Sequence, residues 1–218
     1  MDVRDRRWPR VAIVAGSYLV GAIPWSQILA RGRGVDLRSV DNGTVSGTAL
    51  YRVAGFAPLA LAGSLDVAKG AIGPAVVTAR RPGLAATAAA ASVSGHNWSI
   101  FLRGAGGRGI SPALGALTVR APVGAVVLLG GLVAGRLSRQ TGLGCFVAYL
   151  SLAPVTARVH GRGAAGLSAA VLAPLLAKRL AGNRQPDAWD ARTVVHRLVL
   201  DRDPPERSRR AGMRRLAA

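Results

Sequence analysis

The sequence predicts an all-α, polytopic integral membrane protein with about five to seven transmembrane helices, some of them short. Of the 218 residues, 50% are hydrophobic and only 5% are aromatic, so small and aliphatic residues supply most of the apolar content. They form long unbroken blocks rather than the periodic pattern of a soluble domain. Because short membrane helices leave irregular backbone against polar cavities, we expect polar loops to form a site at one membrane face.

The apolar blocks give the order of the expected helices. The first runs from Val11 to Ala30, about one bilayer thickness. Its N-terminal flank resembles a signal peptide, but the later apolar blocks favour a retained first span. The polar stretch 31–52 is too rich in Gly, Ser, Thr and Asn for a regular helix. The later blocks are 53–79, 83–101, a short piece at 110–119, 121–135, 141–159 and 163–177.

The chain divides into a membrane domain, residues 1–180, and a basic C-terminal tail, residues 181–218. Within 187–200 one helical face is apolar and the arginines lie elsewhere, which predicts an interfacial helix. The apolar face consists of Ala191, Val194, Val195 and Leu198. The remaining tail is predicted to be disordered, and its arginines favour an anionic membrane surface.

The charge distribution points to an anionic partner. The formal net charge is +19, and no acidic residue occurs between Val67 and Pro186. A nucleic-acid-binding protein gathers its positive residues on one face or arm. Here most of them lie in the gaps between apolar blocks, as juxtamembrane arginines do. We therefore expect lipid headgroups or a phosphorylated substrate as partners, and no nucleic acid.

Other common ligand motifs are absent or out of context. The single cysteine, Cys145, lies in an apolar block, which favours a packing role. No His/Asp/Glu cluster has metal-ligand spacing, so we expect no metal and no cofactor. Residues 161–166 match the letters of the dinucleotide fingerprint, but they join two apolar helical blocks instead of a strand and a helix.

The stretch GHNWSIFLRGAGGRGI, residues 95–110, holds the strongest candidate binding loop. Its glycines allow tight turns that expose backbone N–H groups, which can form an anion-binding nest before a helix N-terminus. Its arginines suit phosphate oxygens bidentately. The loop residues are Arg103, Gly104, Gly106, Gly107, Arg108 and Gly109. The alternative is a flexible loop whose arginines reach lipid phosphates.

Three further polar residues lie inside apolar blocks. Asp66 and Lys69 are three apart, so on a helix they share a face and can form an ion pair. Such a pair either has a functional role or only neutralises two charges near a helix end. His96 is either a base or phosphate ligand, or a polar group that packs between helices.

Taken together and in order, several motifs resemble the bacterial acyl-phosphate-dependent glycerol-3-phosphate acyltransferase family (PlsY type). That family carries Gly-His, a phenylalanine five residues on and a Gly-Gly-Lys-Gly loop, here Gly95-His96, Phe101 and 106–109. Four segments upstream resemble, in order, the family's first span, the segment that leads into its first motif, that first motif and its Asp-x-x-Lys-Gly. In this sequence they are YLVGAIPWSQILA, GVDLRSV, DNGTVSGTALYRVAG and DVAKG. The resemblance covers residues 11 to about 115.

The resemblance implies a multi-pass protein of the bacterial inner (cell) membrane that works in phospholipid biosynthesis. The family transfers a fatty acyl group from acyl phosphate to the 1-hydroxyl of glycerol 3-phosphate, which gives lysophosphatidic acid and phosphate. The implied partners are these two substrates and membrane lipids, without a metal or other cofactor.

The resemblance also implies roles for particular residues. Arg108 and the glycines of its loop would bind the substrate phosphate. Arg52 would stabilise the charge of the acyl phosphate, and His96 would organise the site. The hydrogen-bonding groups near the reacting centre would be Asn42, Ser46 and Thr48, and the supporting residues would be Asp66, Lys69 and Arg139.

The sequence departs from the family at several of these positions. In the first motif Asn42 replaces a serine and Ser46 a glycine, and in the loop Arg108 replaces a lysine. The C-terminal Arg-His-x-x-Asn motif is missing, although Lys178 and Arg179 resemble the residues directly after that motif in the family. A non-catalytic relative that binds phospholipid or acyl phosphate as a regulator or scaffold is therefore the alternative. A transporter of a phosphorylated solute would need inverted repeats, and the sequence shows none.

Overall fold

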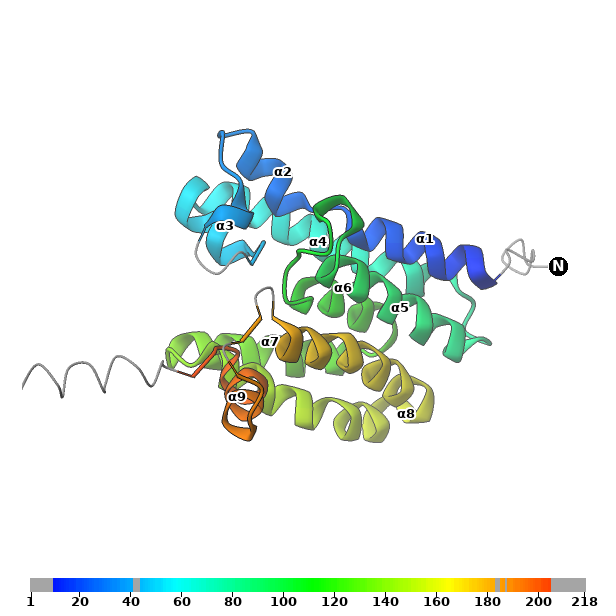
Figure 1. The fold of residues 1–218 in the computed structure, drawn as a ribbon. Helices are drawn as coiled ribbons and strands as arrows, with labels where there is room; N and C mark the ends of the chain where they lie inside the picture. Colours follow the sequence, from blue (N-terminus) through cyan, green and yellow to red (C-terminus); the bar gives the residue numbers. More distant parts are fainter. Residues whose placement is uncertain (1–9, 41–43, 183–184, 187, 205–218) are drawn as a thin grey trace, which may run out of the picture.

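The computed structural model describes residues 10–40, 44–182, 185–186 and 188–204, and in this part all regular elements are helices (Figure 1). Three stretches are long and apolar enough to cross a membrane: Arg10–Arg31, Phe56–Val76 and Thr141–Ala181. The helix Pro122–Leu137 is apolar but shorter. The predicted all-α, polytopic membrane class is confirmed.

The first apolar block forms two helices rather than one. These are α1 (Arg10–Ala22) and α2 (Trp25–Arg31), with Pro24 between them. Proline has no N–H group and its ring restricts the preceding residue, so the helix is interrupted there. The interruption leaves carbonyl oxygens at the end of α1 available to other side chains.

The polar stretch after α2 corrects one expectation. It contains a single turn, η2 (Leu37–Ser39), and a regular helix, α3 (Gly47–Ala54), where none was expected. The Ser46 hydroxyl accepts a hydrogen bond from a backbone N–H in the first turn of α3, so an N-cap outweighs the composition of the stretch. Gly55, with φ of 82°, then separates α3 from α4 (Phe56–Val76).

The middle of the chain forms α5 (Pro82–Asn97), the turn η3 (Ile100–Leu102), α6 (Ile110–Arg120) and α7 (Pro122–Leu137). These helices cross closely where small residues meet backbone. A Cβ at Gly70 of α4 would overlap the backbone of Pro112 in α6. Gly131 and Gly135 of α7 similarly face Gly144 of α8. The small residues thus permit close helix packing.

The last two apolar blocks are joined in α8 (Thr141–Ala181). Gly161 has φ of 80° and ψ of −176°, which is not helical, so it divides α8 into two arms. Arg179 near the end of the second arm donates to the carbonyl oxygen of Gly142 at 3.0 Å. The arms therefore fold back on each other, and the ends of α8 meet at one face of the molecule.

Two apolar clusters stabilise the fold. The larger joins α5, α6, α7 and α8 around Leu117, Leu152 and Val171, and the smaller joins α2, η2, α3 and α4 around Leu37 and Leu50. The larger cluster also contains Cys145, which is buried and unpaired. The packing role predicted for this cysteine is confirmed.

The tail returns to the helical body. It forms α9 (Ala191–Val195) and η4 (His196–Leu200), and η4 packs against α8. Arg197 donates to the carbonyl oxygens of Leu180 and Ala181 at 2.7 and 3.0 Å, which joins η4 to the end of α8. The division at residue 180 and the interfacial helix stay predictions, and the tail predicted to be disordered lies mostly outside the described residues.

Candidate functional site

A buried ion pair on α4 forms the base of the site. Asp66 Oδ1 lies 2.7 Å from Lys69 Nζ, with the two residues three apart as the sequence spacing predicts. The two residues are only 5% and 3% exposed. Lys69 Nζ also donates to the carbonyl oxygen of Ile23 at 2.7 Å, where α1 has ended. The pair therefore does more than neutralise two charges, because it joins α4 to the break between α1 and α2.

His96 lies between this ion pair and the glycine loop. Its Nδ1 is 3.6 Å from Asp66 Oδ1, which is a close electrostatic contact but too long for a hydrogen bond. Its Nε2 faces Gly107, because a Cβ added there would overlap this nitrogen. The imidazole is therefore oriented by a carboxylate on one side and by loop backbone on the other.

A small cavity lies where these groups meet. It brings together the break after α1, the middle of α4, the end of α5 and the glycine loop. The residues that line it are Ala22, Ile23, Pro24, Trp25, Ser26, Val45, Asp66, Lys69, His96, Ser99, Leu102, Gly106 and Gly107. Motifs that are far apart in the sequence thus converge on one polar cavity among apolar helices.

The glycine loop is packed against the end of α5, not free. A Cβ at Gly106 would overlap the carbonyl oxygens of His96 and Asn97, so the loop backbone passes directly over this helix end. Gly109, with φ of 75°, forms the N-cap of α6. Close packing and left-handed backbone therefore require glycine here. The alternative of a flexible loop stays a prediction.

The loop also corrects the expected nest of exposed N–H groups. The N–H of Gly104 donates to the carbonyl oxygen of Ser99 at 2.9 Å, and that of Gly107 donates to the carbonyl oxygen of His96 at 3.2 Å. These donors are used within the loop and its neighbouring helix. An anion at this site would therefore depend more on charged side chains than on these backbone groups.

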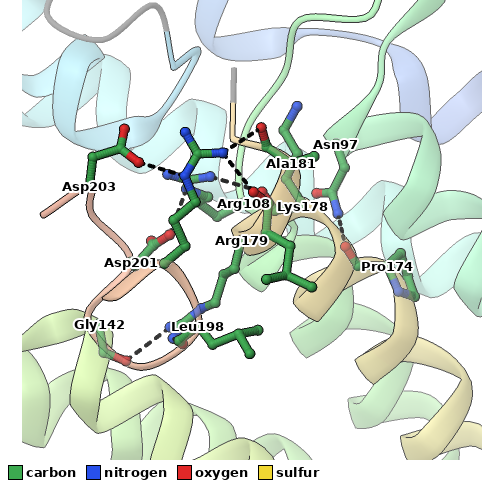
Figure 2. A network of polar contacts seen from close by, with 12 residues as sticks. Asn97, Arg108, Gly142, Pro174, Lys178, Arg179, Ala181, Leu198, Asp201 and Asp203 are labelled. Carbon is green, nitrogen blue, oxygen red and sulfur yellow. Dashed lines mark hydrogen bonds and ion pairs between the residues drawn. The ribbon is translucent and has the colours of Figure 1, made fainter. Parts of the chain in front are cut away.

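The side chain of Arg108 reaches the C-terminal part of the chain (Figure 2). Its Nε lies 3.1 Å from Asp201 Oδ1, and an Nη donates to the carbonyl oxygen of Lys178 at 3.1 Å. The neighbouring Arg179 donates to the carbonyl oxygen of Leu198 at 2.6 Å. The loop, the end of α8 and the tail therefore form one polar network.

Asp201 is one carboxylate of this network, and it follows η4. Burial raises the pKa of the Asp201 carboxyl above its usual value, while the charges of Arg108 and Arg179 oppose that rise. The network contains three arginines and one lysine but only two carboxylates among the described residues: Arg108, Lys178, Arg179 and Arg197 against Asp201 and Asp203. The net local charge is positive, which suits an anionic ligand.

The predicted residues of the first motif lie on the segment around α3. Ser46 caps that helix, and Thr48 and Arg52 are exposed on it. Asn42 lies outside the described residues. Val45, next to the cap, lines the cavity, so the backbone of this segment reaches the site. The catalytic roles of these side chains stay predictions.

Two predicted arginines lie apart from the cavity lining. Arg103 and Arg139 are exposed, with left-handed φ of 55° and 59°. Arg103 adjoins the glycine loop, while Arg139 lies in the turn between α7 and α8. Neither lines the cavity.

The structure adds residues that the sequence pattern did not single out. Ser99 lines the cavity, and its hydroxyl donates to the carbonyl oxygen of Ala22 at 2.6 Å. Asp201 meets Arg108 although no spacing rule connects them. The position of Ser99 directly after a helix end is a weak sequence signal for a polar contact. The contact of Asp201 with Arg108 depends on how the tail folds back, so no sequence signal predicts it.

The fold and this network define an integral membrane protein with a buried, positively charged site at the ends of its helices. The chain belongs to the glycerol-3-phosphate acyltransferase family, whose sequence model matches residues 11–185. The resemblance carried by the motifs is thereby confirmed.

Two relatives illustrate the similarity. The chain is 34% identical to glycerol-3-phosphate acyltransferase 5 of Dehalococcoides mccartyi, over 91% of this chain and 90% of the relative. It is 43% identical to glycerol-3-phosphate acyltransferase 1 of Deinococcus radiodurans, over 49% of this chain and 55% of the relative.

The fold is similar to crystal structures of PlsY (YgiH), an integral membrane glycerol 3-phosphate acyltransferase. Its glycerol 3-phosphate form matches with a TM-score of 0.70 at 22% identity, over 93% of this chain and 98% of that one. Its lysophosphatidic acid form matches with a TM-score of 0.67 at 23% identity, over 78% of this chain and 87% of that one. These matches show the shared fold.

Proposed function

We propose that this chain transfers a fatty acyl group from acyl phosphate to the 1-hydroxyl of glycerol 3-phosphate in the bacterial inner membrane. The hydroxyl oxygen forms a bond to the acyl carbon, and the bond from that carbon to the phosphate oxygen breaks. The hydroxyl proton leaves with the departing phosphate or through a nearby base. The products are lysophosphatidic acid and inorganic phosphate, without a covalent acyl-enzyme.

One observation supports this proposal for a chain of this family. The buried Asp66–Lys69 pair, His96 and the glycine loop converge on one cavity. A reaction between two phosphorylated substrates needs positive groups that hold them in fixed geometry. Arg108 and its loop would bind a substrate phosphate. His96, oriented by Asp66, would hold the reacting hydroxyl, and Arg52 would stabilise the charge of the acyl phosphate.

The experiment is phosphate release by the purified protein in lipid, with palmitoyl phosphate and with or without glycerol 3-phosphate. Release that requires glycerol 3-phosphate supports acyl transfer. Release without it indicates hydrolysis of the acyl phosphate only, and no release with either mixture contradicts the proposal.

The Arg108–Asp201 ion pair favours one alternative, a protein that binds phospholipid or acyl phosphate without turnover. In such a protein the carboxylate would restrain the loop arginine, and the residues missing from the C-terminal motif would not be needed. Saturable binding of acyl phosphate without phosphate release would identify this alternative.

A further inference from the structure

Lys178 is an unusual residue in this fold because its long charged side chain is buried. It lies in the last turn of α8, is 1% exposed and is among the largest fully buried side chains of the described residues. Lysine is rarely buried unless a partner compensates its charge. The environment of its ammonium group therefore needs an explanation.

No carboxylate of the described residues forms an ion pair with Lys178. The contact that its Nζ makes is with the ring of Trp98, at 5.3 Å from the ring centroid. A cation–π contact compensates a buried charge only in part. Lys69 provides the comparison within the same chain, because it is also buried, at 3% exposed, but its Nζ pairs with Asp66 at 2.7 Å.

The charged neighbour that acts on Lys178 is also positive. Arg108 lies close enough for the two charges to repel, and it donates to the carbonyl oxygen of Lys178 itself. Asp201 contacts Arg108 Nε rather than the lysine, and Arg179 is bound by carbonyl oxygens. The end of α8 and the glycine loop thus hold a surplus of buried positive charge (Figure 2).

A buried ammonium group without an anion destabilises a fold, so its presence beside a second cation points to a ligand that supplies the anion. A phosphate group fits best. Its several oxygens can accept from a guanidinium group and from an ammonium group at once. Trp98, which Lys178 contacts, lies two residues after His96, so such a phosphate would lie at the edge of the cavity.

We propose that Lys178 is a substrate-binding residue whose ammonium group, together with Arg108, binds the phosphate of a substrate. This inference rests on the proposed function, because that function supplies the phosphate. Two sources share the chemistry, namely glycerol 3-phosphate and acyl phosphate, and the experiment separates them by measuring KM for each.

The first test measures the ligand-free protein. Lys178→Met removes a charge that lacks a partner, so the Tm in detergent should stay the same or rise. Lys69→Met is the matched control, since it leaves Asp66 unpaired and should lower the Tm. Lys178→Gln provides a second replacement of similar length. If both Lys178 variants lose stability as Lys69→Met does, Lys178 is structural and the inference is overturned.

The second test measures substrate binding in the same variants. The KM for one phosphorylated substrate should rise about tenfold to a hundredfold in Lys178→Met, as expected for the loss of a charge-assisted hydrogen bond. Lys178→Arg should recover most of that loss, and the thermal shift produced by glycerol 3-phosphate or inorganic phosphate should follow the same order. An unchanged KM for both substrates and an unchanged thermal shift would overturn the inference.

These outcomes separate the inference from the proposed function. If the wild-type protein shows no turnover but Lys178→Met abolishes its thermal shift with phosphate ligands, the function fails and the phosphate-binding role stands. If the wild-type protein and Lys178→Met turn over with equal KM values, the function stands and the role of Lys178 fails.

Discussion

Replacing Asp66 by asparagine should destabilise the protein strongly, because it leaves Lys69 buried without its partner. Asp66 is 5% exposed and lies 2.7 Å from Lys69 Nζ. Removing one partner of a buried ion pair costs about 3–5 kcal/mol. Lys69 keeps its hydrogen bond to Ile23, so we expect about 3 kcal/mol, which corresponds to a fall in Tm of about 6–12 °C for a chain of this length.

The single cysteine provides the assay. Cys145 is 1% exposed in the larger apolar cluster, so a fluorogenic maleimide should react with it only on unfolding. The double variant Asp66→Asn/Lys69→Met removes both charges and should lose about half as much stability or less. The reasoning is refuted if Asp66→Asn shifts Tm by less than about 2 °C, or if the double variant is as unstable as the sum of the single variants.

Three further predictions concern the loop, the tail and the turn η2, which Asp36 caps. Gly106→Ala should abolish activity and lower the Tm, because its Cβ would overlap two carbonyl oxygens at the end of α5. Gly104→Ala is the control: it has open space around it and a φ of 83°, so it should cost only about 1 kcal/mol of backbone strain. Thermal melts of the two variants test this difference. Asp201→Asn should lower the KM for glycerol 3-phosphate a few-fold, because it removes a negative charge 3.1 Å from Arg108. An increase in this KM would contradict that reasoning and would mean that the carboxylate positions the arginine. Arg38 donates side-chain hydrogen bonds to the Asp36 carboxylate, which hold the pKa of that carboxyl well below its usual 3.8. The ion pair between the two residues therefore stabilises the fold above pH 3.8 and stabilises it less as the pH falls below 3.8. Asp36→Asn should flatten the acid limb of a plot of Tm against pH.

The membrane fold could be predicted because its signals are local in the sequence. Long apolar blocks with short basic gaps predict helices and their order, and the gap after Val159 predicts the break that the structure places at Gly161. The helix α3 was missed because glycine and threonine content outweighed the capping signal of Ser46. The Asp66–Lys69 pair was predictable since residues three apart share a helical face.

The contacts of the candidate site depended on tertiary structure. His96 lies near Asp66 only because α4 and α5 pack together, and Arg108 meets Asp201 only because the tail folds back past the end of α8. No helical or turn spacing relates such positions. The glycines of the loop were identified correctly as special, but their cause is close packing against α5 rather than freely exposed N–H groups.

The most direct test of the proposed function measures lysophosphatidic acid formed from labelled glycerol 3-phosphate and palmitoyl phosphate by three proteins. These are the wild type, Arg108→Ala and Arg162→Ala, the last an exposed arginine beside Gly161, at the bend between the two arms of α8. We predict product from the wild type and from Arg162→Ala, and a fall in kcat/KM of about a hundredfold or more in Arg108→Ala. Equal product formation by Arg108→Ala and Arg162→Ala would contradict the assignment of the catalytic site to the glycine loop.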